Sequence, residues 1–310
     1  MKLSILIITY NHEKYIAQAL ESVLSQQVDF DYEIVIGEDC STDSTRAIVL
    51  RYQQCHPGKI RTVLPTINLG VVRNFVQTYH ACTGEYVALL EGDDFWTSPT
   101  KLQNQVTFLD ANPEYVGCFH DVAVVDSSSS PIANPFFSHP PREIQNLKDV
   151  TAKFCIPTCS TVFRRKIVTS FPEWFFEMPM CDWPLHVLLA EHGSLRYIPE
   201  KLASYRIHAG GVWSLTKRAD ILERTIYAAN CIKIYLGGRY GRILAKKIAL
   251  LNYEIGTIFF SEKQYKKTLL YTCMSIKACS SSLLVYYKLL TLPLRGFILR
   301  RQQLNSTRHT

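Results

Sequence analysis

The sequence predicts an α/β protein whose N-terminal part forms a doubly wound, mostly parallel sheet and whose C-terminal part is all helical. Short apolar runs alternate with segments of helical periodicity over residues 1–125, which is typical of parallel strands joined by crossover helices. The runs at 3–8 and 86–90 are almost entirely apolar, as expected of strands buried on both faces. Beyond residue 215 only helical periodicity remains. We therefore predict two parts, 1–215 and 216–310.

The individual elements follow from periodicity and from start and stop residues. Strands are predicted at 3–8, 33–37, 60–64, 86–90, 115–125 and 158–164, with a pair of short extended segments at 195–206. Helices are predicted at 13–26, 98–112, 182–192, 219–236, 243–260, 265–278 and 283–300. Two further helices are predicted: one runs from an N-cap at Ser41 or Thr42 to residue 54, and one follows the turn at 68–74. The Pro-rich stretch 126–141 is expected to be a loop, either a plain surface connection or a lid over an acceptor site.

Composition indicates a folded globular protein. The 310 residues are 47% hydrophobic and 20% charged, which excludes an intrinsically disordered chain. The ten cysteines form no C-x-x-C pair and no zinc-like spacing with histidine, so we expect reduced thiols in a cytoplasmic protein. The apolar run at the start is too short for a signal peptide, and no run approaches the roughly 18 apolar residues of a membrane span.

Charge is distributed unevenly along the chain. Residues 1–215 carry 17 Lys or Arg against 23 Asp or Glu, whereas 216–310 carry 17 against 4. A basic, apolar half suits an anionic partner such as membrane headgroups or a lipid-linked phosphate. The segment 283–300 has the composition of an interfacial helix, which predicts peripheral association with the cytoplasmic face of the inner membrane; the alternative is a helical hairpin packed on the first part. Binding of nucleic acid is not expected, because the basic residues lie among apolar helices without a recognised motif.

Polar side chains follow three of the predicted strands, at Thr9-Tyr10-Asn11, Glu38-Asp39 and Glu91-Gly-Asp-Asp94. The carboxyl ends of parallel strands meet at one edge of a sheet, where ligands bind. Thr9 and Asn11 supply short polar groups, Tyr10 a ring for stacking, and Asp39 an acceptor for a uracil N–H or ribose hydroxyls. Clustered carboxylates suit Mg²⁺ or Mn²⁺, although a solvated acidic turn is the simpler alternative. The sequence has no G-x-G-x-x-G after the first strand and no P-loop, so a metal ion is expected to neutralise phosphate.

Four ordered blocks, at 4–16, 33–44, 68–74 and 84–96, resemble the family 2 glycosyltransferases with the GT-A fold. The blocks are Ser-Ile-Leu-Ile-Ile-Thr-Tyr-Asn-His-Glu-Lys-Tyr-Ile, Glu-Ile-Val-Ile-Gly-Glu-Asp-Cys-Ser-Thr-Asp-Ser, Asn-Leu-Gly-Val-Val-Arg-Asn and Gly-Glu-Tyr-Val-Ala-Leu-Leu-Glu-Gly-Asp-Asp-Phe-Trp. The resemblance continues more loosely to about residue 214 and does not cover the helical tail. The sequence lacks Q-x-x-R-W, so it looks like the non-processive bacterial members, which add one sugar at a time.

The resemblance implies roles for residues that bind the donor. Thr9 and Tyr10 would bind the nucleotide base, Asp39 its imide, and Arg73 other polar groups of the donor. Glu91-Gly92-Asp93 stands where the family has its D-x-D motif, with Glu in place of the first Asp. Asp93 would then be the preferred metal ligand, Glu91 would face the ribose or metal-bound water, and Asp94 would face the sugar.

Two later segments also resemble family motifs. Met180-Cys-Asp-Trp-Pro-Leu-His186 matches the segment of the catalytic base, which would be Asp182, although Cys181 replaces the usual second acid. The alternative is that Asp182 only caps a helix. Tyr205-Arg-Ile-His208 matches the segment whose His approaches the metal or the diphosphate, and a purely structural His208 is equally consistent with the sequence. Arg164 or Arg165 is expected either to contact an acceptor phosphate or to be an ordinary surface arginine.

The activity implied is that of a metal-dependent, inverting glycosyltransferase that uses Mn²⁺ or Mg²⁺. The donor would be a nucleotide-diphosphate sugar, most simply a UDP-sugar, and the acceptor a saccharide or a lipid-linked saccharide of a bacterial surface polymer such as O-antigen. Because Cys181 replaces one acid of the base motif, an inactive nucleotide-sugar-binding or membrane-surface module of the same fold is the alternative. A sugar-nucleotide pyrophosphorylase would need a Gly-rich, Arg-containing loop after the first strand, which Thr9 to Glu13 does not offer.

Overall fold

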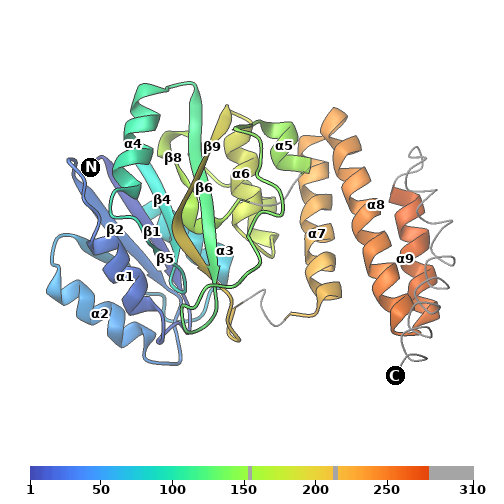
Figure 1. Cartoon of the computed structure of the whole chain (residues 1–310), viewed down its shortest axis with the longest axis horizontal. Coiled ribbons are helices and arrows are strands. Elements are labelled where there is room, and N and C mark those ends of the chain that lie inside the picture. The colour runs from blue at the N-terminus through green and yellow to red at the C-terminus, as the bar shows by residue number, and fades with distance from the viewer. Residues whose placement is uncertain (153–155, 212–215, 279–310) are drawn as a thin grey trace. The chain divides into compact units, whose positions relative to one another are not determined.

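The computed structural model describes residues 1–152, 156–211 and 216–278 of the chain. The chain divides into two compact units, Met1–Leu215 and Thr216–Thr310, which Figure 1 colours from blue to yellow and from orange to red. Every cysteine in the described ranges is a free thiol.

The first unit begins with four parallel strands in the spatial order β3-β2-β1-β4. They are β1 (Leu3–Thr9), β2 (Tyr32–Glu38), β3 (Ile60–Val63) and β4 (Tyr86–Glu91), connected by the helices α1 (Ile16–Leu24), α2 (Thr45–Cys55) and α3 (Val71–Ala81). Parallel neighbours need long crossovers, and the helices provide them. The predicted α/β class and the four strands are confirmed.

The sheet then continues with strands that run in both directions. After β4 the order is β8 (Val162–Arg164), β6 (Tyr115–Val125), β9 (Ser194–Arg206) and β5 (Phe95–Trp96), and β7 (Ile144–Gln145) also pairs with β9. The other elements are α4 (Lys101–Ala111), α5 (Leu147–Ala152), α6 (Asp182–Ala190) and the 3₁₀ turns η1 (Thr158–Ser160), η2 (Arg165–Ile167) and η3 (Glu173–Glu177). The sheet is therefore mixed, since β8 is antiparallel to both β4 and β6.

Three local predictions need correction. The segment 158–164 is a strand only from Val162 onward, because η1 precedes it. The region 195–206 is one strand, whose register with β6 skips Pro199 and Glu200; proline has no N–H for the ladder, so pairing is interrupted there but resumes. Helix α2 begins at Thr45, after an N-cap at Ser44, and not near residue 42.

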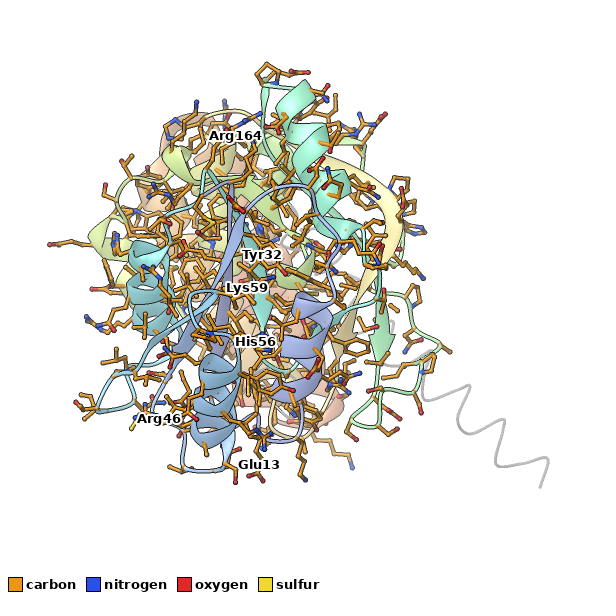
Figure 2. The ribbon with its side chains drawn as sticks, turned by 90° about the vertical axis from the view of Figure 1, so that its left-hand side faces the viewer. Glu13, Tyr32, Arg46, His56, Lys59 and Arg164 are labelled. Atoms are coloured by element: carbon orange, nitrogen blue, oxygen red, sulfur yellow. The ribbon has the colours of Figure 1, made fainter. Side chains whose placement is uncertain are left out.

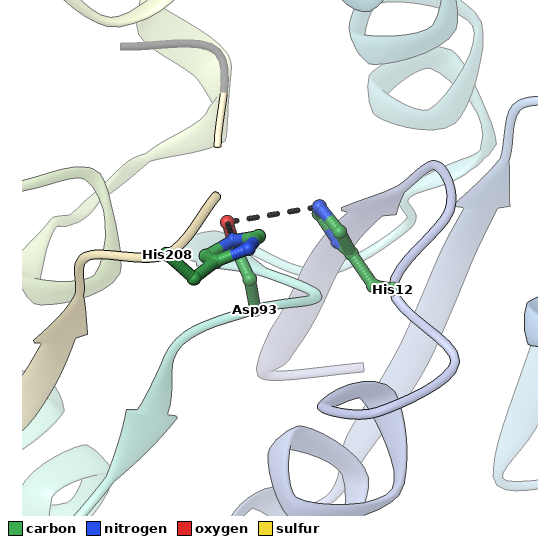
Figure 3. A group of neighbouring side chains, drawn as sticks. All are labelled: His12, Asp93 and His208. Carbon is green, nitrogen blue, oxygen red and sulfur yellow. Dashed lines mark hydrogen bonds and ion pairs between the residues drawn. The ribbon is translucent and has the colours of Figure 1, made fainter. Parts of the chain in front are cut away.

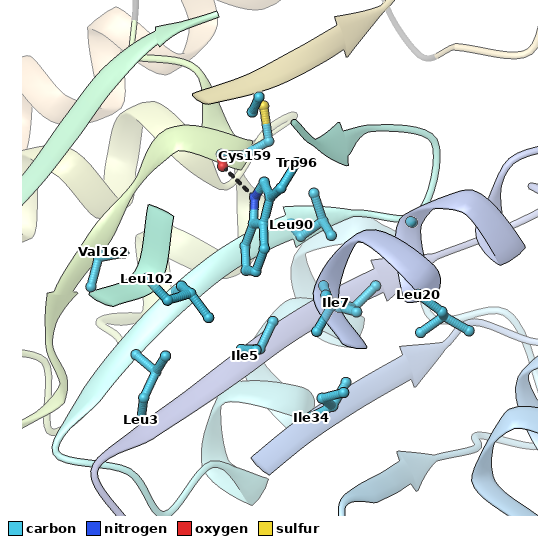
Figure 4. Packing of buried hydrophobic residues seen from close by; sticks show 14 of the residues in the cluster. Leu3, Ile5, Ile7, Leu20, Ile34, Leu90, Trp96, Leu102, Cys159 and Val162 are labelled. Atoms are coloured by element: carbon cyan, nitrogen blue, oxygen red, sulfur yellow. Dashed lines mark hydrogen bonds between the residues drawn. The ribbon is translucent and has the colours of Figure 1, made fainter. Parts of the chain in front are cut away.

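The core of the first unit lies between the sheet and the helices α1, α2 and α4. Alternate residues of β1 and β2, such as Ile5, Ile7 and Ile34, pack against apolar side chains of these helices, as Figure 4 shows. Trp96 is buried within this core, and its indole N–H donates to the Cys159 carbonyl over 2.8 Å. Burial of aliphatic side chains of this size stabilises the fold by about 1.5–3 kcal/mol each.

Helix α3 packs against β1 and β2 and approaches the backbone of β2 closely. The Asn74 side-chain amide donates to the Gly37 carbonyl over 2.9 Å, and a Cβ at Gly37 would overlap the Thr78 hydroxyl. Glycine is therefore required at position 37 for α3 to pack at this depth. This packing brings the first turn of α3 to the carboxyl edge of the sheet.

The second unit is helical in the part that the structure describes. It contains α7 (Arg218–Leu236), α8 (Gly238–Ser261) and α9 (Tyr265–Ala278), with α8 packed against both of the others. Leu222, Ile255 and Phe259 form its buried apolar contact, on which Tyr271 packs. The helix predicted at 283–300 lies outside the described residues. Among the helices described, none combines the length and the apolar character that crossing a bilayer requires.

Candidate functional site

Polar residues at the ends of three strands lie along one edge of the sheet. The register pairs Thr9 with Glu38 and Ile8 with Glu91, so the loops after β1, β2 and β4 are neighbours. In Figure 2, Glu13 and Arg46 mark this edge, and Arg164 lies at the opposite end of the sheet. All donor-binding and metal-binding residues predicted from the first hundred positions belong to this edge or to the first turn of α3.

The loop after β1 is held in place by the loop after β2. Asn11 has a positive φ of 56°; its N–H donates to the Ser41 hydroxyl over 2.9 Å, and its side-chain oxygen accepts from the Thr42 N–H over 2.9 Å. The backbone N–H of His12 donates to the Thr45 hydroxyl over 2.8 Å. Tyr10 stays 41% exposed, so its ring is accessible for stacking. Asn11 therefore has a structural role, in addition to whatever contact it makes with a ligand.

Asp39 connects the end of β2 to the start of α3. One of its carboxylate oxygens accepts from the Leu69 N–H over 2.8 Å and the other from the Gly70 N–H over 2.9 Å. Asp39 is 3% exposed, and each of its carboxylate oxygens keeps a second lone pair with which it would accept from a ligand N–H. Arg73, one turn into α3, is exposed and lies over the Phe176 ring at 5.7 Å.

Three side chains from distant parts of the sequence meet at this edge: His12, Asp93 and His208 (Figure 3). His208 Nε2 is 3.0 Å from Asp93 Oδ2, and His12 Nε2 is 3.6 Å from the same oxygen. The three potential ligand atoms lie within 4.8 Å of one another. The sequence predicted Asp93 and His208 as metal ligands but did not single out His12, whose only sequence signal is its position directly after a strand end.

The two histidines set the charge state of Asp93. Burial alone would raise the pKa of Asp93, but the nearby His12 and the hydrogen bond from His208 outweigh it, and the pKa of this carboxyl lies below its usual value. Burial lowers the pKa of His12, against the opposing effect of Asp93. An ionised carboxylate beside a neutral imidazole is the form in which both groups can bind a divalent cation.

Glu91, Asp93 and Asp94 form an acid triplet, in which Glu91 and Asp94 are in different surroundings from Asp93. Burial, followed by the charges of Asp93, Asp94 and Asp182, raises the pKa of Glu91 well above its usual value. Asp94 is only 2% exposed, and its carboxylate accepts from the Arg206 N–H over 2.8 Å. The contact of this carboxylate is with the end of β9, and a role of Asp94 toward the donor sugar stays a prediction.

Arg206 holds in place the turn that contains the acid triplet, residues 91–94, which we call the acid turn. The sequence did not predict Arg206 as a site residue. Arg206 is 3% exposed, and its Nε donates to the Asp93 carbonyl over 2.7 Å. The rest of its guanidinium donates to the Asp126 carbonyl, the Ser129 hydroxyl and the Gln18 side-chain oxygen. Arg206 therefore ties the acid turn to α1 and to the start of the Pro-rich loop. The sequence signal was present in Tyr205-Arg-Ile-His208.

Asp182 is the first residue of α6, and Cys181 occupies the N-cap, so the alternative that Asp182 itself is the N-cap is wrong. Burial raises the pKa of Asp182 to about 6, although the Trp183 N–H opposes the shift. The Cys181 thiol lies 3.6 Å from the Val71 carbonyl, which brings the start of α6 next to the start of α3.

The predicted base lies near the acid triplet. The charge of Asp182 is close enough to raise the pKa of Glu91. The pKa of Tyr205 is also raised, first by burial and then by Asp94, Glu91, Asp93 and Asp182 together. Four carboxyl groups from β4, its following turn and α6 are therefore close enough to Tyr205 to act on its phenol, and Phe136 of the Pro-rich loop packs against that ring at 5.4 Å.

The arginines considered for an acceptor phosphate lie elsewhere. Arg164 donates to the Tyr115, Leu109 and Asn112 carbonyls, and Arg165 donates to the Gly84 carbonyl. Gly84 and Tyr115 precede or begin their strands, so both arginines are at the edge opposite residues 91–94; Figure 2 shows Arg164 at that end. The expectation of a phosphate contact was wrong.

Comparison with known proteins gives consistent relatives. The family model described as "Glycosyl transferase family 2" matches residues 4–171, more than half of the chain. A protein of Mycobacterium tuberculosis named "Uncharacterized protein Rv1520" is 38% identical over 217 residues, covering 68% of this chain and 60% of the relative. "Uncharacterized glycosyltransferase alr2836" of Nostoc is 32% identical over 219 residues, covering 67% of this chain and 65% of the relative. The chain thus spans less than two thirds of the length of either relative.

Solved structures share the fold. A Staphylococcus aureus TarS fragment, residues 1–349, in complex with UDP-GlcNAc has a TM-score of 0.65 at 20% identity, covering 90% of this chain and 81% of that one. The mannosyltransferase PcManGT of Pyrobaculum calidifontis, in complex with GDP-Man and Mn²⁺, has a TM-score of 0.58 at 17% identity, covering 96% of this chain and 80% of that one. At these identities the likeness concerns the fold.

Proposed function

The chain belongs to glycosyl transferase family 2, and from this premise we propose that it transfers a sugar from a nucleotide-diphosphate donor to a hydroxyl group of a saccharide acceptor. The single observation that supports the proposal is that Asp93 and Asp182 both lie close enough to Glu91 and Tyr205 to raise the pKa of each. The proposed metal ligand and the proposed base are therefore neighbours of the same two side chains.

The donor is proposed to be a UDP-sugar. Tyr10 offers an exposed ring and Asp39 a carboxylate with free lone pairs beside it, which suits a uracil and its imide N–H. Arg73 lies on the first turn of α3, next to the Leu69 and Gly70 turn that Asp39 holds, and is exposed toward solvent. The structural relative TarS was solved with UDP-GlcNAc, which supports this choice of donor class.

A divalent cation fits the residues at this edge. Asp93 is an ionised carboxylate with imidazole nitrogens at 3.0 and 3.6 Å, and Asp93 with His208 would hold the ion. When bound, Mn²⁺ or Mg²⁺ would neutralise the charge of the donor diphosphate. Arg206 and Gln18 contribute indirectly, because they hold the Asp93 turn in one conformation.

Asp182 is proposed to be the base of an inverting displacement. Its carboxylate takes the proton of the acceptor hydroxyl, whose oxygen forms a bond to the anomeric carbon on the face opposite the leaving diphosphate. The bond between that carbon and the diphosphate oxygen breaks in the same step, and the nucleotide diphosphate departs. A pKa of about 6 leaves Asp182 ionised at neutral pH and basic enough to accept a proton.

The acceptor is proposed to be a saccharide or a lipid-linked saccharide. The excess of basic over acidic residues in 216–310 suits an anionic lipid carrier or the cytoplasmic face of a membrane, where the protein would bind peripherally. The competing proposal is an inactive binding module, and the observation in its favour is Cys181 in place of a second acid.

The test is release of UDP from a panel of UDP-sugars, measured with and without Mn²⁺ and with EDTA. We expect release by the wild type that EDTA abolishes, and at least about a hundredfold less release by Asp182→Asn, since general base catalysis contributes 10²–10⁴-fold. Glu173→Gln, which removes an exposed carboxylate at the start of η3, is the matched control and should keep its activity. Binding of UDP without any turnover across the panel would favour the inactive module.

A further inference from the structure

We propose that His12 is a third protein ligand of the metal ion, so that the site is a two-histidine, one-carboxylate site that binds first-row transition ions such as Co²⁺ or Mn²⁺ in preference to Mg²⁺. This inference rests on the proposed function only for the presence of a cation at Asp93. It assigns a ligand and a metal preference that the D-x-D resemblance does not supply.

The distance between His12 and Asp93 suits coordination of a shared ion better than a direct hydrogen bond. His12 Nε2 and Asp93 Oδ2 are 3.6 Å apart, which is too long for a hydrogen bond. Two ligand atoms that are each about 2.1 Å from one ion stand roughly 3.0 Å apart at right angles and roughly 3.4 Å apart in a tetrahedron. The separations of 3.0 and 3.6 Å around Asp93 Oδ2 are close to these values.

Nε2 of His12 faces Asp93, and Nδ1, on the other side of the ring, faces the Thr9 hydroxyl. His12 Nδ1 lies 3.2 Å from the Thr9 hydroxyl. When Nδ1–H donates to that oxygen, the lone pair of Nε2 faces Asp93, which is the second-shell arrangement typical of metal-bound histidines. His208 differs, because its Nδ1 accepts from the Gly210 N–H over 3.2 Å and its Nε2 lies within hydrogen-bonding distance of Asp93. In this arrangement Nε2 carries the proton, so His208 binds an ion through Nε2 only after it changes tautomer and gives up the bond from Gly210.

The side chains of Thr9 and His12 lie close to the backbone of the acid turn at Gly92. A Cβ at Gly92 would overlap the Thr9 hydroxyl and lie 3.0 Å from His12 Nδ1, so only glycine allows the Thr9 and His12 pair to rest on that turn. The His12 N–H is held by the Thr45 hydroxyl, and Asn11 before it takes a positive φ. The imidazole is therefore positioned before any ion arrives.

Nitrogen ligands determine the metal preference. Mg²⁺ demands oxygen ligands, whereas imidazole binds first-row transition ions, with an affinity that rises from Mn²⁺ through Co²⁺ to Cu²⁺. Glu91 stands in place of the first Asp of the motif and is not part of the group formed by His12, Asp93 and His208. The chemical class of the cofactor is thus a divalent first-row transition ion.

The test is metal binding by the full chain, stripped with EDTA, without donor or acceptor. Free Mn²⁺ is measured by EPR during titration, Mg²⁺ is tested as competitor, and pulsed EPR of bound Mn²⁺ reports coordinated imidazole nitrogen. We expect His12→Ala to weaken Mn²⁺ binding by about tenfold or more, as for losses at metal sites generally, and to narrow the preference for Mn²⁺ over Mg²⁺. His80→Ala, an exposed histidine in the last turn of α3, is the matched control and should bind like the wild type.

The decisive variant is His208→Ala, which leaves His12 as the imidazole of the cluster. A nitrogen coupling to Mn²⁺ that persists in His208→Ala and disappears in the double variant supports the proposal, and it does so whether or not the protein transfers sugar. Unchanged Mn²⁺ affinity in His12→Ala, or no nitrogen coupling in His208→Ala, overturns it. If His12→Ala fails to fold by circular dichroism, the His208→Ala spectrum still decides the question.

Discussion

Replacing Asp182 by Asn is expected to make the protein more stable at neutral pH while it loses activity. Burial raises the pKa of the Asp182 carboxyl from 3.8 to about 6. A shift of about two units corresponds to about 3 kcal/mol, and partial solvation of a half-buried carboxylate reduces this to about 1–2 kcal/mol. Ionising Asp182 in the folded protein therefore costs free energy, and a neutral asparagine at this position avoids that cost.

The pH dependence gives this prediction its sign. Because the pKa of Asp182 is higher in the folded than in the unfolded state, the folded state binds more protons between pH 3.8 and about 6, and wild-type stability falls as pH rises through this window. The cost is absent below the window and complete above it. The stabilisation by Asp182→Asn should therefore be full at pH 8 and shrink toward zero near pH 4.

The assay is urea unfolding of the wild type, Asp182→Asn and the control Glu173→Gln at pH 8, 6 and 4.5, followed by circular dichroism. Glu173 is exposed at the start of η3, so its substitution should change stability by less than about 0.5 kcal/mol. An Asp182→Asn protein that is no more stable than the wild type at pH 8, or that retains full turnover, would refute the assignment of Asp182 as a buried base.

Three further predictions concern the same edge of the sheet. The rate of UDP release at saturating substrate should rise about tenfold per pH unit below about pH 6 and level off above it, because Asp182 must be ionised to act as a base; a pH profile that is flat from 5 to 8 contradicts this. Gly92→Ala should reduce metal binding and cost about 1–3 kcal/mol of stability, since the added methyl group overlaps the Thr9 hydroxyl; unchanged metal affinity by titration would show that the close approach is unimportant. Arg206→Lys should destabilise the protein by about 2–4 kcal/mol in urea unfolding, because an ammonium group cannot reproduce the bonds to Asp93, Asp126 and Gln18; equal stability would mean that the guanidinium network is dispensable.

Local sequence patterns were sufficient for the elements that carry most of the site. The strands β1, β2 and β4 are short apolar runs with polar residues directly after them, so both their limits and their shared edge follow from chain order and parallel pairing. The start of α6 at Asp182 was also predictable, because apolar residues follow an acid there.

Features that depend on distant partners could not be predicted in this way. Asp94 looks like its neighbour Asp93 in the sequence, and only pairing with β9 shows that it is buried against Arg206. Arg164 occupies the amino edge because β8 runs antiparallel to β4, and a short strand gives no local signal of its direction. His12 is brought to Asp93 and His208 by the sheet register, over separations of 81 and 196 residues in the numbering.

The central claim is that the carboxyl edge of the sheet binds a nucleotide diphosphate through a cation on Asp93. Isothermal titration of UDP into the EDTA-stripped full chain, with and without added Mn²⁺, tests this most directly. The account predicts that Mn²⁺ tightens UDP binding by at least about tenfold in the wild type and has no effect in Asp93→Ala, since the ion neutralises the diphosphate. Equal UDP affinity with and without Mn²⁺, or an Asp93→Ala protein that behaves like the wild type, would contradict it.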